Sequence, residues 1–342
     1  MRYKLLGKSG LRVSELCLGT MTFGDTWGWG APKDDCKKMF DLYAEAGGNF
    51  IDTSINYTDG EAEQILGNLL KADRDHFVLS SKYTLTKPDA TDPNAGGNSR
   101  KNMMKSVERS LKHLQTDHLD LYYLHAWDYM TPVEEVMRGL DDLVRMGKVN
   151  YVGISDSPSY IAAEGNAIAE LRGWSRFIAL QVPYSLAGRA PERSLMPMAK
   201  HWDMAVLTWG VLKSGVLTGK FLKEDHDSKR TNPKRLKLSD QEMSIVQEVV
   251  AIGEEIDRPA SQVAINWVRQ QQHKAQTIPI IGARTEAQMQ DNLAVVDWQL
   301  SDEHLQRLET VSQIDLGFPH GFLEANPYVF GATFDKIDNH RA

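Results

Sequence analysis

Eight short apolar runs alternate with longer amphipathic segments along most of the chain. Each run has the length and composition of a buried strand, and each segment between them has the spacing of a helix with one apolar face. The runs are Glu15–Leu18, Asn49–Ile51, Phe77–Ser81, Leu119–Leu124, Val149–Ile154, Ile178–Gln181, Ala205–Trp209 and Thr277–Ile280. Strict alternation of strand and helix predicts an α/β fold with a parallel sheet covered by helices. Eight such units favour closure into a (β/α)8 TIM barrel.

The intervening helices have recognisable starts and stops. Thr131 and Pro132 precede Glu134 and Glu135, which is typical of a helix start, and Gly147 supplies a stop. The expected helices cover residues 34–47, 61–71, 99–114, 132–146, 158–172, 193–201, 259–272 and 285–293. Barrels with insertions reach 342 residues, so we predict a single barrel domain over residues 1–342.

Three segments lie outside this repeat. Tyr3–Gly10 followed by Leu11–Val13 predicts a small hairpin that plugs the N-terminal end of the barrel. Gly219–Asp240 predicts an extended loop after the seventh strand, which either stays solvated or folds in part over a bound cofactor. The tail, residues 311–342, carries five aromatic residues without a helical period. We expect it to pack on or near the barrel, with lining of the pocket mouth as the alternative.

Charge and composition exclude several classes of function. A net charge of −7 leaves no basic stripe to neutralise phosphates, so we expect no nucleic-acid partner. Cys17 and Cys36 are too few for a disulfide framework and lack zinc-ligand spacing, so we expect no metal site. Met1–Gly10 has no apolar signal core, and no apolar run reaches membrane-spanning length. We therefore expect a cytoplasmic protein without a membrane partner.

Four chemically active side chains follow successive strand ends, the face at which barrel enzymes place their sites. Tyr57 is the candidate general acid; because a free phenol has a pKa of about 10, it donates well only when its anion is stabilised. Lys82 is the candidate cation that lowers the pKa of Tyr57. Asp52 would keep the buried Lys82 charged, and His125 would donate or accept at the substrate oxygen.

Each of these residues also has a structural explanation when it is taken alone. Asp52 could cap a helix or turn, and Lys82 could reach from a strand end into solvent. His125 could be a satisfied core histidine, and Tyr57 a surface aromatic. Their joint occurrence at successive strand ends favours the catalytic interpretation over four separate structural ones.

Several short motifs occur in order along the chain. They are D-x4-Y at Asp52–Tyr57, S-S-K at Ser80–Lys82, Y-L-H at Tyr123–His125, G-I-S at Gly153–Ser155, the pair Gln181 and Tyr184, GVLTGK at Gly215–Lys220, and PIIGAR at Pro279–Arg284 with DNL out to Leu293. Together these motifs resemble those of the aldo-keto reductase superfamily, from about Tyr3 to Thr310. The resemblance implies a barrel that binds NADP(H) across its C-terminal face. It also implies hydride transfer between the nicotinamide and an aldehyde or ketone, with Tyr57 giving the proton.

The resemblance further implies a set of cofactor-binding residues. Near the reacting centre these are Gly19, Thr20, Met21 and Asp52. The nicotinamide carboxamide would contact Ser155, Asp156 and Gln181, and its ring would stack on Trp209. The pyrophosphate would follow Gly210, Val211, Leu212, Lys213 and Ser214, with Lys220 and Arg230 closing over it. The 2′-phosphate would bind Gly282, Arg284 and Gln288, and the adenine would bind Asp291 and Asn292.

The physical chemistry of the last turn agrees with a phosphate site. Gly282 lets the backbone approach an anion, and the helix that starts near Thr285 presents free N–H groups. Arg284 adds a planar cation suited to phosphate, although it could also be a solvent-facing loop arginine. An acidic residue here would have suited a free 2′-hydroxyl, so the turn favours NADPH over NADH.

Three positions depart from the family's usual pattern. Asp156 stands in place of the usual Asn, so it can accept a hydrogen bond from the carboxamide but cannot donate one when ionised; its effect on the cofactor is left open. Gly210–Leu212 replaces the usual Ser-Pro-Leu and lacks one hydroxyl for the pyrophosphate. Thr58–Gly60 replaces the common Gly after the catalytic Tyr. None of these changes removes a catalytic group.

The substrate pocket is expected between Tyr57 and His125. Its walls would be the aromatic residues Phe23, Trp27, Trp29 and Trp127. Such walls suit apolar or aromatic aldehydes, although a Trp-rich loop can equally be hydrophobic core. Because hydride transfer is reversible, the enzyme could also run as an alcohol or sugar dehydrogenase, and its physiological substrate and direction are left open.

A different interpretation comes from Thr208–Gly215, which resembles voltage-gated potassium channel β subunits at its Trp. On that interpretation the barrel binds NADP(H) as a redox-sensing regulatory subunit. The complete set of four catalytic side chains favours turnover, because binding alone would not need all of them. The oligomeric state is left open.

Overall fold

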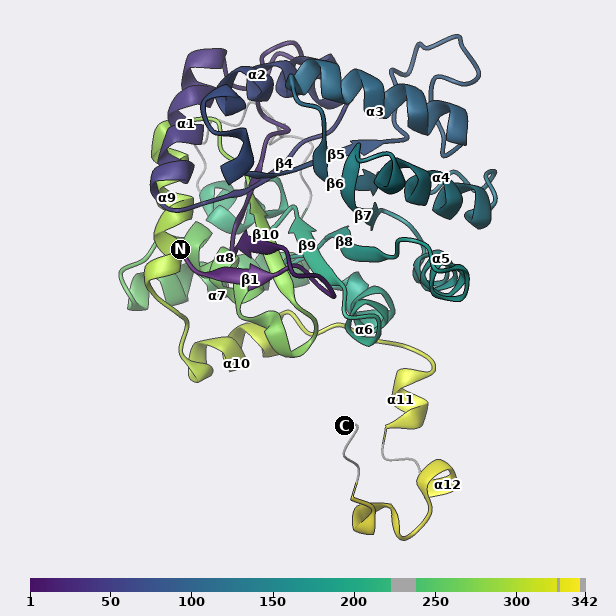
Figure 1. Cartoon of the computed structure of the whole chain (residues 1–342). Helices are drawn as coiled ribbons and strands as arrows, with labels where there is room; N and C mark the ends of the chain where they lie inside the picture. Colours follow the sequence, from purple (N-terminus) through teal and green to yellow (C-terminus); the bar gives the residue numbers. More distant parts are fainter. Residues whose placement is uncertain (223–237, 325–326, 339–342) are drawn as a thin grey trace.

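Eight parallel strands close into a barrel in the computed structural model, which describes residues 1–222, 238–324 and 327–338 (Figure 1). The strands are β3 (Cys17–Gly19), β4 (Phe50–Asp52), β5 (Val78–Tyr83), β6 (Leu119–Leu124), β7 (Val149–Ser155), β8 (Phe177–Pro183), β9 (Ala205–Trp209) and β10 (Thr277–Ile281). They follow one another in chain order around the barrel, and β10 closes it by pairing with both β9 and β3. The predicted (β/α)8 barrel is confirmed.

Helices lie around the outside of the barrel (Figure 1). Those that follow the strands are α1 (Lys33–Glu45), α2 (Glu61–Leu69), α3 (Arg100–Leu114), α4 (Val133–Arg145), α5 (Ser159–Arg172), α6 (Leu195–His201), α8 (Ala260–Arg269) and α9 (Glu286–Leu293). Their apolar faces pack on the strands; in α4, for example, Val136, Leu140 and Leu143 are buried. The eight predicted helices are therefore confirmed.

Two further helices, α7 (Asp240–Glu255) and α10 (Asp302–Val311), pack against each other and were not expected from the sequence. Each begins at a serine that caps it. Ser239 accepts a hydrogen bond from the Glu242 N–H, and Glu242 bonds back to the Ser239 N–H, which makes a capping box. Ser301 accepts from the His304 N–H in the same way.

The N-terminal hairpin closes one end of the barrel as predicted. It pairs β1 (Tyr3–Leu5) with β2 (Arg12–Ser14) in antiparallel register. Leu6 and Val13 are fully buried and pack into the apolar interior of the barrel. The Lys8 N–H donates to the Asp203 carbonyl, just before β9. The hairpin thus blocks the N-terminal end, and a functional site has to open at the C-terminal end.

The C-terminal tail leaves the barrel after α10. The Arg193 guanidinium donates to the Asp315 carbonyl, and His320 Nε2 lies 2.7 Å from the Arg193 carbonyl. Apart from this contact of its first residue, α11 (His320–Leu323) lies away from the barrel, as does α12 (Pro327–Phe330) (Figure 1), and Phe318 is almost fully exposed. The structure does not show the aromatic tail packed on the barrel. That packing, and the single-domain assignment, stay predictions.

The loop predicted at Gly219–Asp240 falls mostly outside the described residues. Arg230 is among the residues that are not described, so a clamp over the cofactor stays a prediction. In the described part of the chain, no helix combines the length and the apolar character needed to cross a membrane.

Candidate active site

A cavity of about 690 Å³ opens at the C-terminal ends of the barrel strands. This volume is within the usual range for small-molecule and cofactor sites. Residues from six consecutive strands or the loops after them line it: Gly19, Asp52, Tyr57, Leu85, His125, Asp156 and Gln181. Trp209 and the turn after β10 complete its wall.

Lys82 lies at the centre of a buried cluster at one end of this cavity. Its ammonium donates to Asp52 Oδ2 at 2.6 Å, to the Thr53 carbonyl at 2.8 Å and to Tyr57 Oη at 3.1 Å. The Lys82 side chain is fully buried, and a buried ammonium needs such partners. The expected convergence of carboxylate, ammonium and phenol is therefore observed; their catalytic roles stay predictions.

Burial and charge act in opposite directions on this cluster. Burial lowers the pKa of Lys82, but Asp52 and Tyr57 raise it, with a net shift above its ordinary value. Burial raises the pKa of Tyr57, and this effect outweighs the lowering by the Lys82 charge. The expectation of a lowered phenol pKa was therefore wrong for the net shift, because it did not include the depth of burial. Tyr57 holds its proton at neutral pH.

The Asp52 carboxylate is held by three donors. Besides Lys82, Ser80 Oγ donates to Oδ1 at 3.0 Å and Gln181 Nε2 donates to Oδ1 at 2.9 Å. Asp52 is thus tied to β5 and β8 as well as to its own strand. This network limits where the Lys82 ammonium can sit, and through it the phenol of Tyr57.

His125 lies beside Tyr57, with 6.1 Å between the ring centroids and the rings nearly perpendicular. Its Nδ1 is 3.1 Å from Ser54 Oγ, which also bonds Asn56 Oδ1 at 2.7 Å. Burial and the Lys82 charge lower the pKa of His125 well below its ordinary value, so the imidazole is neutral. Ser54 and Asn56 were not predicted as site residues, although both lie in the loop between Asp52 and Tyr57.

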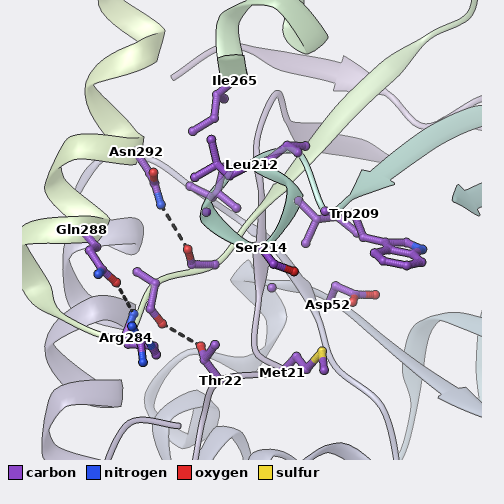
Figure 2. A pocket seen from close by; sticks show the side chains of 18 of the residues that line it. Met21, Thr22, Asp52, Trp209, Leu212, Ser214, Ile265, Arg284, Gln288 and Asn292 are labelled. Carbon is purple, nitrogen blue, oxygen red and sulfur yellow. Dashed lines mark hydrogen bonds between the residues drawn. The ribbon is translucent and has the colours of Figure 1, made fainter. Parts of the chain in front are cut away.

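Asp156 and Trp209 meet at the wall next to this cluster. Trp209 Nε1 donates to Asp156 Oδ1 at 3.3 Å. The indole is 41% exposed, so it presents a face to the cavity. Figure 2 shows Trp209 and Asp52 projecting on the same side of the cavity. Burial raises the pKa of Asp156, and the Trp209 hydrogen bond and the Lys82 charge oppose that rise.

The turn after β10 forms the opposite end of the cavity (Figure 2). Thr285 caps α9 by accepting from the Gln288 N–H, and Gln288 Oε1 accepts from the Arg284 N–H at 2.9 Å. Thr22 Oγ1 donates to the Ala283 carbonyl at 2.6 Å, and Asn292 Nδ2 to the Gly282 carbonyl at 3.2 Å. The turn is therefore braced from both sides. The Arg284 guanidinium forms no hydrogen bond or ion pair within the described parts of the chain.

Asp291 lines the same end and is held by α8. Ser261 Oγ lies 2.5 Å from Asp291 Oδ2, and Gln262 Nε2 donates to Oδ1 at 2.8 Å. Its carboxylate therefore has a fixed direction.

No group of three or more His, Cys, Asp or Glu side chains within the described residues is arranged to hold a metal ion.

Most of the expected cofactor residues line this cavity. They are Gly19, Met21, Asp52, Asp156, Gln181, Trp209, Gly210, Val211, Leu212, Ser214, Lys220, Gly282, Arg284, Gln288, Asp291 and Asn292. Three others do not line it. Thr20 Oγ1 donates to the Asp52 carbonyl, Ser155 is buried, and Lys213 Nζ donates to the Ala187 carbonyl.

The expected walls of the substrate pocket need correction. Only Trp27 of the four aromatic residues lines the cavity. Phe23 is fully buried in the core between barrel and helices, and Trp127 packs on the same core. Trp29 packs on Trp27, with 5.7 Å between the ring centroids. Leu85, which was not predicted, lines the cavity from the loop after β5.

Comparison with known proteins agrees with this geometry. The sequence matches the model of the aldo/keto reductase family over residues 15–313. It is 35% identical to the norsolorinic acid reductase of Aspergillus flavus, over 94% of this chain and 84% of that protein. It is 36% identical to the aryl-alcohol dehydrogenase GME11368 of Pestalotiopsis microspora, over 94% and 85%. The aryl-alcohol dehydrogenase (NADP(+)) of Phanerodontia chrysosporium is 34% identical, over 91% and 86%.

Proposed function

The chain belongs to the aldo/keto reductase family of oxidoreductases, and we propose that it transfers a hydride between NADP(H) and an aromatic aldehyde or ketone, with Tyr57 as the general acid. In the reverse direction the same residues would oxidise the corresponding aryl alcohol. The bound nicotinamide supplies or accepts the hydride, and the protein's residues handle the proton and the position of the substrate.

The contact between Lys82 and Tyr57 carries this proposal. When Tyr57 gives its proton to a substrate oxygen, a phenolate is left in a buried site. The Lys82 ammonium, 3.1 Å from the phenol oxygen, stabilises that anion, and Asp52 keeps the ammonium charged. The neutral His125 imidazole beside the phenol is placed to hydrogen-bond the substrate oxygen. A positioned acid of this kind typically contributes about 10²- to 10⁴-fold to the rate.

The other end of the cavity fits a dinucleotide with an extra phosphate. The Arg284 guanidinium forms no hydrogen bond or ion pair with the described part of the chain, and the turn that carries it leads into the N-terminus of α9. Gly282 and Gly210 leave room for an anion against the backbone, since a Cβ at either position would meet nothing closer than 3.7 Å. Asp291 is fixed at the same end for a neutral donor such as an adenine amine. These features support NADP(H) over NAD(H).

The class of substrate rests on the cavity wall and on the relatives. Trp27, Leu85 and Trp209 give the wall near Tyr57 an apolar, partly aromatic surface. Planar aromatic rings bury well on such a surface. Two of the similar proteins are named as aryl-alcohol dehydrogenases and one as a norsolorinic acid reductase. An aryl aldehyde is therefore the first substrate to test.

The test is aldehyde-dependent oxidation of NADPH, followed with 4-nitrobenzaldehyde for wild type and Tyr57→Phe. We expect Tyr57→Phe to lose a factor of about 10² or more in kcat while NADPH binding survives. Tyr129→Phe is the matched control, because Tyr129 is exposed and does not line the cavity. Equal rates for wild type and Tyr57→Phe would contradict the proposal. Tight NADPH binding without any turnover would instead favour the redox-sensing regulatory subunit.

A further inference from the structure

Asp156 adds a second carboxylate to the end of the cavity that holds Lys82. It follows β7 directly and lines the cavity together with Tyr57 and Trp209. Its Oδ1 accepts from Trp209 Nε1 at 3.3 Å, and its backbone N–H donates to the Gln181 carbonyl at 3.3 Å. Neighbouring strands on the barrel wall therefore fix the position of this carboxyl group.

The charges at this end of the cavity do not cancel. Lys82 is paired with Asp52, and these two contribute +1 and −1. His125 is neutral, since burial and the Lys82 charge lower its pKa. Asp156 contacts a neutral indole, and it forms no ion pair with any Lys or Arg among the described residues. One negative charge remains when Asp156 is ionised.

We propose that Asp156 makes this site bind the oxidised cofactor, NADP⁺, in preference to NADPH. The nicotinamide ring is cationic in NADP⁺ and neutral in NADPH, while the rest of the two molecules is the same. A fixed carboxylate in a partly buried wall therefore attracts one redox form and has little net effect on the other. The inference rests on the proposed function, because it needs the nicotinamide at the Tyr57 end of the cavity.

This preference has a consequence for the reaction. The equilibrium constant between the two redox forms on the enzyme differs from its value in solution by the ratio of their two dissociation constants. The form that binds more tightly is therefore favoured on the enzyme. Preferential binding of NADP⁺ pulls the bound equilibrium toward NADP⁺ and alcohol, which is the direction of carbonyl reduction. It also slows the release of NADP⁺ relative to NADPH.

The test is isothermal titration of the full chain with NADP⁺ and with NADPH at about pH 8, for wild type and Asp156→Asn. The amide keeps an oxygen for the Trp209 N–H and tolerates the positive φ of +37° at this position, but it removes the charge. We expect Asp156→Asn to weaken NADP⁺ by roughly tenfold, equivalent to about 1.4 kcal/mol, and to change NADPH by less than about threefold. Asp156→Gly, which also suits a positive φ, should shift the ratio the same way.

Asp291→Asn is the matched charge control. It removes one carboxylate from the opposite end of the same cavity, so it should change the affinities for NADP⁺ and NADPH by the same factor. If both Asp156 variants leave the ratio of affinities unchanged, or shift it toward NADP⁺, the inference is wrong. If the wild type binds neither form, the proposed function itself is wrong, so the two failures are distinguishable.

Discussion

Lys82 Nζ and Asp52 Oδ2 lie 2.6 Å apart, and both side chains are buried. Their strands explain the pairing. Asp52, the last residue of β4, is level with Ser80 on β5, and Lys82 follows Ser80 by two residues. Residues two apart in a strand point to the same face, so Ser80 and Lys82 both face the interior of the barrel, where Asp52 meets them.

Removing one partner of this pair should destabilise the fold. Asp52→Asn leaves the Lys82 ammonium buried without a counter-charge, and breaking a buried pair in this way typically costs about 3–5 kcal/mol of unfolding free energy. Urea unfolding measures the loss. The exposed pair of Lys37 and Asp41 offers a control, since Asp41→Asn should leave the stability nearly unchanged. The double variant Asp52→Asn with Lys82→Met should recover part of the loss. A double variant no more stable than the single one would contradict this account.

Under the mechanism that we propose, the pKa of Tyr57 sets the pH dependence of the two directions. Alcohol oxidation would then need Tyr57 as a phenolate that accepts a proton, and burial raises the pKa of this phenol above its ordinary value. We expect kcat/KM for an aryl alcohol to rise by about tenfold per pH unit up to at least pH 10. For aldehyde reduction kcat/KM should stay level from about pH 6 to pH 9, where the phenol keeps its proton. Steady-state rates in both directions check this, and a plateau for oxidation below about pH 9 would contradict it.

Much of this architecture follows from the sequence because strand ends are easy to locate. All eight barrel strands were predicted to within a few residues from their apolar runs, and the strand ends then place Asp52, Lys82 and His125 at one face. Parallel strands in a closed barrel leave little freedom in where such residues lie. The net pKa shift of Tyr57 could not be predicted, because it depends on how deeply the side chain is buried.

The irregular loops were predicted less well. Phe23, Trp29 and Trp127 lie in loops, where the sequence has no regular spacing that indicates which side chains face the cavity. These three of the four residues expected to line the substrate pocket do not line the cavity. The helix α7 was missed although its capping box, Ser239 with Glu242, is visible in the sequence. It begins at the end of the long polar segment Gly219–Asp240, whose composition predicts an extended loop.

The neutral state of His125 should make stability fall in acid. Its pKa in the folded protein lies well below the unfolded value of about 6.5, so below pH 6.5 the unfolded chain binds a proton that the folded protein does not. This lowers the unfolding free energy by about 1.4 kcal/mol per pH unit as the pH falls below 6.5. His125→Gln should remove this contribution, so its stability should depend less on pH between about 5 and 7. The exposed His201→Gln is the control, and equal pH dependence for wild type and His125→Gln would contradict the assignment.

Asp59, two residues after Tyr57, joins Trp27 of the cavity wall to the loop after β5. Its Oδ1 accepts from Trp27 Nε1 at 3.5 Å, and its Oδ2 lies 3.1 Å from Lys87 Nζ. Asn tolerates the positive φ at this position, so Asp59→Asn should keep the backbone conformation. The substitution removes the charge that attracts Lys87, and the contacts that hold Trp27 in the cavity wall should loosen with it. We expect KM for an aryl aldehyde to rise a few-fold with little change in kcat, because the reacting groups are not touched. Lys87→Gln should have the same effect, and a fall in kcat alone would contradict this role.

Arg284 should decide between the two dinucleotides. Its guanidinium has no partner in the described chain and lies at the opposite end of the cavity from Tyr57. Because only NADPH carries the 2′-phosphate, Arg284→Ala should weaken NADPH by roughly 10- to 100-fold, the usual worth of a hydrogen bond to a charged group. NADH should change by less than about threefold. Fluorescence titration with both dinucleotides measures this, with the exposed Arg172→Ala on α5 as control. Equal losses for NADPH and NADH would mean that Arg284 contacts a part shared by both cofactors, and would remove it from 2′-phosphate recognition.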